Sequence, residues 1–211
     1  MARELSGNKC RICRREGQKL FLKGQKCATE KCPFARRPTP PGMRGKKRPP
    51  KPSYYALQLR EKQKTKRMYG MQEKQFRRFY DLATKSRGIT GRMLLQLLER
   101  RLDNVIYRAL FAFSRNQARQ YVLHGYVAIH GRKVNIPSYI VREGEEIQIK
   151  QNDKFKKMVK ENMEANAKDR SVPDWLTVDK SALAVKIVRM PTKEEIGIPV
   201  NEQFIVELYS K

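Results

Sequence analysis

The chain has 211 residues, of which 47 are Lys or Arg and 21 are Asp or Glu, so its formal net charge at pH 7 is +26. A field of this sign and strength recruits polyanions, and the phosphate backbone of a nucleic acid is the natural partner. No apolar run is long enough to cross a bilayer and the first residues carry no secretory signal, so we expect a cytoplasmic protein with no membrane partner.

Four cysteines lie in the first part of the chain with the spacing Cys-x2-Cys-x13-Cys-x4-Cys. Two close pairs of thiolates can complete the tetrahedral coordination of one ion, so the pattern predicts a structural zinc knuckle. An iron-sulfur cluster is the alternative, because it uses the same ligands and a proline follows the last cysteine, as in ferredoxin motifs. The predicted ligands are Cys10, Cys13, Cys27 and Cys32.

Residues 36–52 contain many prolines and glycines among basic side chains, which excludes a regular helix or a central strand. We expect an extended basic arm that is at least partly disordered in free solution and becomes ordered along RNA phosphates. The candidate RNA contacts in this arm are Arg44, Lys46, Lys47 and Arg48.

Three helices are expected after the arm. Ser53 is a good N-cap for a long helix that runs to Gly70, and a second helix starts at Met71. The aromatic residues of the second helix recur at helical spacing, which favours a place in the core over base stacking. An apolar helix that follows Thr90 should continue past Asp103, and we expect Asp103 to be a helix cap or the ion-pair partner of an arginine.

Residues 114–149 predict one compact unit, a helix followed by a β-hairpin and a further strand. Ser114 and Gln117 form a capping box at the start of the helix, and Gly125 can end it. One side of the helix is apolar and packs, while the other side and the tip of the hairpin are polar or basic. The candidate RNA contacts of this unit are Arg115, Asn116, Arg119, Gln120, His124, Tyr126, Arg132 and Lys133.

The last part of the chain mixes helix and strand signals. Residues 151–170 predict a charged helix, and the only tryptophan, Trp175, should anchor the segment that follows. Residues 182–188 and 203–208 alternate as strands, with a short helix between them, and we expect this tail to return to the main body.

The helix-plus-hairpin unit, the stretches 101–108 and 134–139, and the final segment 199–210 resemble the family of the fourth protein of the bacterial small ribosomal subunit. The resemblance covers essentially the whole chain, in order. It implies direct, early binding to the 5′ domain of 16S-type ribosomal RNA, and with it nucleation of subunit assembly. It also implies a place in the small ribosomal subunit near the channel through which messenger RNA enters, a contribution to translational accuracy, and neighbouring ribosomal proteins such as the fifth. Many members of the family carry the cysteine set and are treated as zinc proteins.

We therefore expect an α+β protein with a mostly helical N-terminal part. Its divisions would be the metal knuckle and basic arm (1–52), a helical body (53–98), the RNA-binding module (99–162) and a C-terminal β/α tail that packs back on the body (163–211).

An enzyme is not expected. Pseudouridine synthases often carry the same RNA-binding module and use an aspartate that follows Arg-Leu, as Asp103 does here. However, that catalytic aspartate lies in a large domain after the module, whereas Asp103 precedes the module in an apolar helical stretch. An RNA-modifying enzyme or an RNA chaperone is retained as the alternative function.

Overall fold

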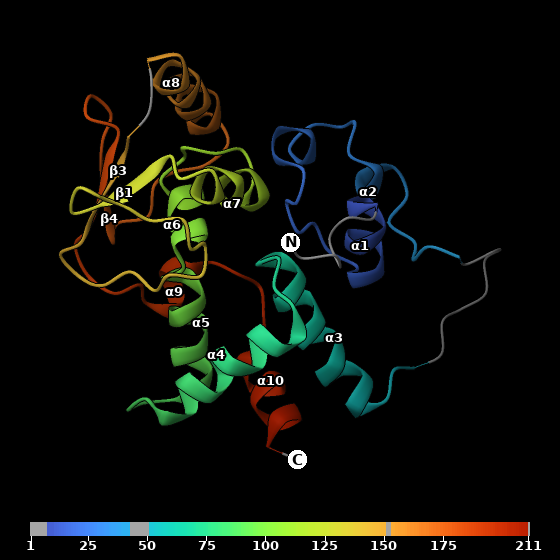
Figure 1. Cartoon of the computed structure of the whole chain (residues 1–211). Helices are drawn as coiled ribbons and strands as arrows, with labels where there is room; N and C mark the ends of the chain where they lie inside the picture. Colours follow the sequence, from blue (N-terminus) through green and yellow to red (C-terminus); the bar gives the residue numbers. More distant parts are fainter. Residues whose placement is uncertain (1–7, 43–50, 151–152, 211) are drawn as a thin grey trace. The chain divides into compact units, whose positions relative to one another are not determined.

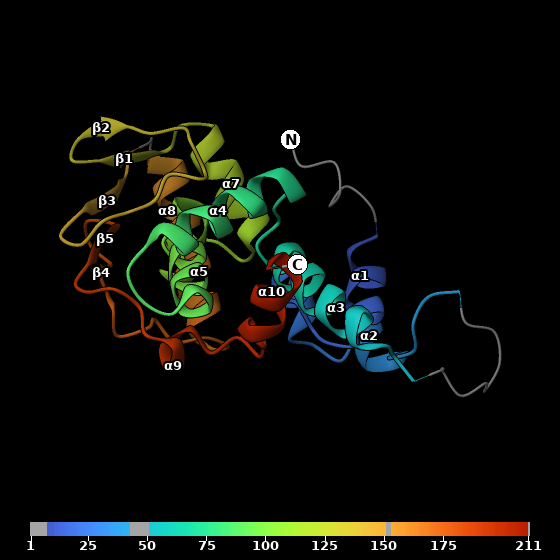
Figure 2. The same cartoon turned by 90° about the horizontal axis from the view of Figure 1, so that it is seen from below.

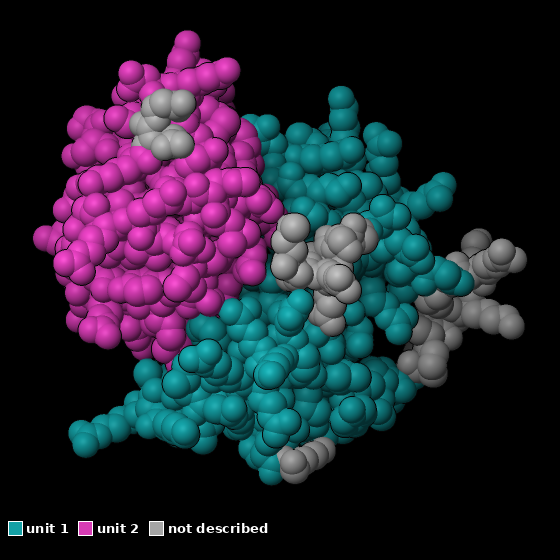
Figure 3. Space-filling model, viewed as in Figure 1, with its two compact units in different colours: residues 1–94, 198–211 teal, residues 95–197 magenta. Residues whose placement is uncertain are grey.

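The computed structural model describes residues 8–42, 51–150 and 153–210. The chain divides into two compact units (Figure 3). Unit 1 contains residues 1–94 and 198–211, and unit 2 contains residues 95–197. The arm residues Arg44, Lys46, Lys47 and Arg48 lie outside the described residues, and the four-part division stays a prediction.

Unit 1 is helical where it is described. Its elements are α1 (Lys9–Glu16), the 3-10 turn η2 (Gly24–Cys27), α2 (Pro33–Arg36), α3 (Tyr54–Met68), α4 (Glu73–Lys85), the start of α5 (Thr90–Glu99) and α10 (Glu202–Tyr209) (Figure 1). The predicted cap of α3 is confirmed, because the hydroxyl of Ser53 accepts a hydrogen bond from the Ala56 N–H at 3.2 Å. The core position of the α4 aromatics is also confirmed: Phe76 and Phe79 are buried.

The predicted strand at 203–208 is wrong, because these residues form α10, which packs on α3 (Figure 1). The apolar residues in this short run fit a helical period as well as an alternating one, so periodicity alone does not decide. The side chain of Asn201 accepts a hydrogen bond from the Gln203 N–H at 3.1 Å and caps the helix. Tyr209 then packs on Phe76 and Tyr80 of α4, so tertiary contacts favour the helix.

Unit 2 combines helices with one antiparallel sheet. The helices are the end of α5, α6 (Leu102–Arg108), α7 (Arg115–Leu123), α8 (Asp153–Ala167) and the short α9 (Lys193–Ile196). The strands are β1 (Val127–Ile129), β2 (Arg132–Lys133), β3 (Glu146–Ile149), β4 (Leu176–Asp179) and β5 (Ala184–Ile187), in the order β2-β1-β3-β5-β4 (Figure 2). This mixture is the expected α+β class. The strand at β5 was predicted, whereas β4 was not.

The long helix expected after Thr90 is broken between α5 and α6. Arg101 has an extended backbone, with φ −64° and ψ 135°, and forms an isolated antiparallel bridge with Ile140. Its side chain is fully buried. The chain therefore leaves the helix at Arg101, where the backbone pairs with another segment of unit 2, and a new helix begins at Leu102.

The hairpin is shorter than predicted. His130 and Gly131 both have positive φ, 45° and 79°, as a tight two-residue hairpin turn requires. The register pairs Ile129 with Arg132. β2 ends at Lys133, and Ile136 beyond it is 56% exposed, although the alternating pattern of the hairpin would place it on the packed face.

The core of unit 2 lies among α6, α7, α8 and the sheet. Trp175 is 1% exposed, which confirms its predicted role as an anchor. None of the helices in the described ranges has the length and apolar character needed to cross a membrane.

Candidate nucleic-acid interface

The start of α7 is fixed by a modified capping box. The hydroxyl of Ser114 accepts a hydrogen bond from the Gln117 N–H at 3.3 Å, as predicted. The side chain of Gln117 accepts from the N–H of Phe113, not from that of Ser114, and donates to the hydroxyl of Tyr121. Both ends of the Gln117 amide are therefore used, and they hold the first turns of α7 in place.

Arg115 and Arg119 lie on the half-buried side of α7, where both have partners within unit 2. The Arg115 Nε donates to Asn104 Oδ1 at 2.7 Å, and its guanidinium lies 4.5 Å from the ring centroid of Tyr107. The Arg119 Nη1 lies 3.5 Å from Asp103 Oδ2. These contacts fix both cations on a preformed surface, where a phosphate would meet them without a large loss of side-chain entropy.

Asp103 is the ion-pair partner of an arginine, as predicted. Arg101 donates to both carboxylate oxygens of Asp103, at 3.1 and 2.7 Å, and both side chains are buried. Such a bidentate pair leaves a neutral unit in the interior. A carboxylate held in this way is a structural counter-ion and is not available as a nucleophile.

A second group of candidate residues gathers at the other end of α7. The ring of the exposed His124 stacks on Tyr126, with centroids 5.7 Å apart, and Tyr126 packs on Phe155 of α8 at 4.2 Å. An exposed aromatic ring that is held in place by packing on further rings is suited to stack on an unpaired base.

Gly125 brings Lys133 to the same place. Gly125 has φ +71°, and a Cβ built on it would lie 1.8 Å from Lys133 Cε, so the lysine crosses directly over the glycine. Lys133 and its neighbour Arg132 are exposed on β2. The end of α7 and the hairpin thus form one basic and aromatic surface, which we call the hairpin face: His124, Tyr126, Arg132 and Lys133.

The candidate contacts of the module therefore fall into two groups along α7. Asn116 is half-buried beside the first group, and Gln120 is exposed between the two. Sequence reasoning missed Asn104 and Tyr107, which position Arg115. Their only signal was local: Asn104 is a polar residue in an otherwise apolar stretch. The RNA-binding role of all these residues stays a prediction.

The four cysteines lie on three short elements of unit 1: Cys10 and Cys13 on α1, Cys27 on η2 and Cys32 at the N-cap of α2. Cys13, Cys27 and Cys32 are buried and Cys10 is half-buried. Burial raises the pKa of the Cys13 and Cys27 thiols, and the neighbouring thiols raise it further. Within the described residues, no group of three or more His, Cys, Asp or Glu side chains is placed to hold an ion. The predicted metal knuckle is therefore not seen.

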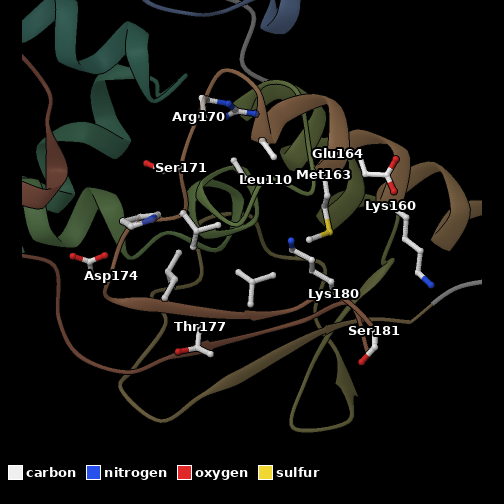
Figure 4. Close-up of a pocket in the computed structure, with 15 residues that line it drawn as sticks. Leu110, Lys160, Met163, Glu164, Arg170, Ser171, Asp174, Thr177, Lys180 and Ser181 are labelled. Carbon is white, nitrogen blue, oxygen red and sulfur yellow. The ribbon is translucent and has the colours of Figure 1, made fainter.

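Unit 2 also has a cavity of about 920 Å³ beside α8 (Figure 4). Its floor is apolar and includes Leu110 and Met163, and Lys180 extends toward Met163 across it, whereas Lys160 and Glu164 lie to the outer side. The residues that line it include no histidine or cysteine.

Two known families match consecutive parts of the chain. Residues 4–99 match the family described as the ribosomal protein S4/S9 N-terminal domain, and residues 100–147 match the S4 domain. These matches define the chain as a ribosomal protein that carries an S4-type module.

Individual relatives are similar over nearly their whole length. The chain is 53% identical to small ribosomal subunit protein uS4A of Symbiobacterium thermophilum over 206 residues, which is 98% of each chain. It is 54% identical to uS4 of Halothermothrix orenii and 49% identical to uS4 of Thermus thermophilus, over 97% of this chain and 98% of each relative. The chain therefore belongs to the uS4 family of small ribosomal subunit proteins, which confirms the resemblance to that family.

Proposed function

We propose that this protein is a structural constituent of the small ribosomal subunit in the cytoplasm and that it binds 16S-type ribosomal RNA directly. The observation that carries this is membership of the uS4 family over 98% of the chain. The relatives are named as ribosomal subunit proteins, not as enzymes, and the function is accordingly non-catalytic. Asp103, the only residue that suggested a modifying enzyme, forms a buried ion pair with Arg101.

The two groups of candidate residues, Arg115 with Arg119 on α7 and the hairpin face beyond it, support different roles in RNA binding. Arg115 and Arg119 would meet phosphates as fixed cations, and they would position the RNA without reading its sequence. The hairpin face would supply a cation, Lys133, next to an aromatic pair on which an unstacked base can lie. Asn116 and Gln120 between them can add directional hydrogen bonds.

The finer role follows the resemblance. We propose that the RNA partner is the 5′ domain, that binding occurs early enough to nucleate assembly, and that the protein lies near the channel by which messenger RNA enters and contributes to translational accuracy. Arg44, Lys46, Lys47 and Arg48 would face the messenger RNA. A neighbouring small-subunit protein, number five, is the proposed protein partner.

The test is the affinity of the full-length protein for the 5′ domain RNA and for a shuffled RNA of equal length. At near-physiological salt we expect a preference of about 100-fold or more, because specific contacts add to the salt-dependent background. Equal affinity for the two RNAs would contradict the proposal and favour a general RNA chaperone. The variant Arg132→Gln with Lys133→Gln should lower the affinity by about 10-fold, since two phosphate contacts are lost.

We also propose that the four cysteines bind zinc, with an iron-sulfur cluster as the alternative. The donor set supports zinc: four cysteines stand at the spacing Cys-x2-Cys-x13-Cys-x4-Cys, and the Lys23 N–H donates to Cys27 Sγ at 3.4 Å, as outer-sphere donors do around thiolate sites. Cys10 and Cys13 would act from α1, Cys27 from η2 and Cys32 from the N-cap of α2. Bound zinc would join these three short elements, which are individually too short to be stable.

A further inference from the structure

Helix α4 of unit 1 is basic on the side opposite the one it buries. Phe76, Phe79 and Ala83 are buried. At 100° per residue, Lys74, Arg78 and Lys85 fall within a sector of about 40° on the far side. All three are exposed.

This stripe of cations continues beyond the helix. Arg77 flanks it on α4, and Arg87 and Arg92 follow in the loop and in the first turn of α5; all are exposed. Among the described residues, none of these six side chains makes an ion pair or a hydrogen bond. We call the set the α4 face: Lys74, Arg77, Arg78, Lys85, Arg87 and Arg92.

The acidic residues nearby do not neutralise this face. Glu73 forms ion pairs with Lys62 and Lys66, at 2.6 and 3.1 Å, and accepts a hydrogen bond from the hydroxyl of Tyr209. Asp81 is therefore the one acid that shares the exposed side of α4 with the cations.

Helix α8 provides a contrast within the same chain. Its exposed lysines, Lys154, Lys156, Lys157 and Lys160, are interspersed with Asp153, Glu161 and Glu164. Mixed charges of this kind are what a helix face needs for solubility alone. The α4 face has six cations and one acid, Asp81, and the mutual repulsion of the cations is unfavourable unless a polyanion offsets it.

We propose that the α4 face binds the phosphate backbone of the ribosomal RNA, as a contact surface separate from the S4 domain. This inference rests on the proposed function and adds a second site to it. From Lys74 to Lys85 the stripe is about 16 Å long at 1.5 Å per residue, enough to meet several successive phosphates. Arginine and lysine without base-reading partners position RNA irrespective of sequence, so the α4 face would add affinity and orientation.

The first test compares two triple variants that each remove three positive charges. The stripe variant is Lys74→Gln, Arg78→Gln and Lys85→Gln, and the control is Lys168→Gln, Lys180→Gln and Lys186→Gln, three exposed lysines of unit 2. The two variants have equal net charge. The stripe variant should bind the 5′ domain RNA about 10-fold or more weakly than the wild type, and the slope of log affinity against log salt concentration should decrease by an amount that corresponds to about two to three phosphate contacts. The control variant should lose no more than about 3-fold.

Equal losses in the two variants, with the wild-type preference for the 5′ domain intact, would refute the α4 face and leave the proposed function standing. A wild-type protein without that preference would refute the proposed function itself. A second variant, Asp81→Asn, gains affinity if the face meets phosphates, since it removes the one acid there, and an unchanged affinity would count against the face. Circular dichroism checks that each variant is folded.

Discussion

Arg119 lies 3.5 Å from Asp103, a buried carboxylate that already accepts hydrogen bonds from Nε and Nη2 of Arg101. The side chain of Arg119 is 24% exposed, whereas that of Arg101 is fully buried. One carboxylate therefore serves an interior arginine and an arginine that reaches the surface. Arg119, the candidate RNA contact, therefore shares its counter-ion with a buried arginine of the core.

Asp103→Asn should destabilise unit 2 by about 3–5 kcal/mol, because it removes the negative charge beside a fully buried guanidinium. Trp175 is the only tryptophan and is buried in unit 2, so urea denaturation followed by its fluorescence reports on this unit alone. Arg119→Gln is the control. It removes only the outer partner and should cost about 1 kcal/mol or less. Equal denaturation midpoints for Asp103→Asn and the wild type would contradict the structural role of this pair.

Gly125→Ala should reduce both stability and RNA affinity. The backbone at Gly125 is left-handed, so a side chain there costs about 1–2 kcal/mol, and its Cβ would also displace Lys133. Gly144→Ala is a matched control, because Gly144 has φ +79° but nothing lies within 4 Å of the added Cβ.

Both glycine variants should therefore show a similar shift of the Trp175 unfolding curve. Only Gly125→Ala should weaken binding to the 5′ domain RNA, by several-fold, as one phosphate contact is lost. If the two variants bind RNA equally well, Lys133 is not a contact that Gly125 positions.

The stability of unit 1 should fall in acid through Glu73. Burial alone would raise the pKa of Glu73, but hydrogen bonds from Lys62, Tyr209 and Lys66 outweigh it, and the pKa is lowered in the folded state. The stabilisation is thus present above the unfolded pKa of about 4.3 and is lost as the pH falls through the folded value. It should amount to about 1 kcal/mol or less, because the Glu73 side chain is 44% exposed.

Hydrogen exchange of α3, α4 and α10 at several pH values measures this effect. Glu73→Gln should lower protection at neutral pH and should flatten its dependence on pH. Protection in the wild type that is the same at pH 3 and pH 6 would contradict the prediction.

Metal removal should loosen the start of the chain and leave unit 2 intact. We expect the purified protein to contain about one zinc ion, and chelation or Cys27→Ser to increase proteolysis in the region of the cysteines, since the ion would close that loop. The Trp175 fluorescence should not change, which makes unit 2 an internal control. Visible absorbance with bound iron would favour the cluster, and equal proteolysis with and without chelator would argue against any structural metal.

Local sequence signals were enough to predict where helices begin, but not which residues contact Arg115 and Arg119. Ser53 and Ser114 cap helices as expected because capping depends on residues three apart in sequence. Periodicity also placed Arg115 and Arg119 together on a side of α7 other than its buried apolar side. Their partners Asp103 and Asn104 lie on α6, and no local pattern indicates that a later helix will contact them.

The failures have the same origin. The run at 203–208 is too short for its period to be decisive, and contacts with α3 and α4 make it a helix. The break at Arg101 depends on a bridge to Ile140, nearly forty residues later. The strand β4 was missed, although its partner β5 was found, because β4 has only four residues and just one of them is buried, so its alternating signal is weak.

Unit 1 is built from two segments of the sequence, one before unit 2 and one after it. During synthesis, α3 leaves the ribosome more than a hundred residues before α10, which packs on it and whose Tyr209 contacts α4. The contiguous residues of unit 2 are all made before α10, so the S4-type module can begin to fold while α3 and α4 still lack this partner. The N-terminal half of a new chain is therefore translated first, but unit 1 can be completed only after the last helix has been made.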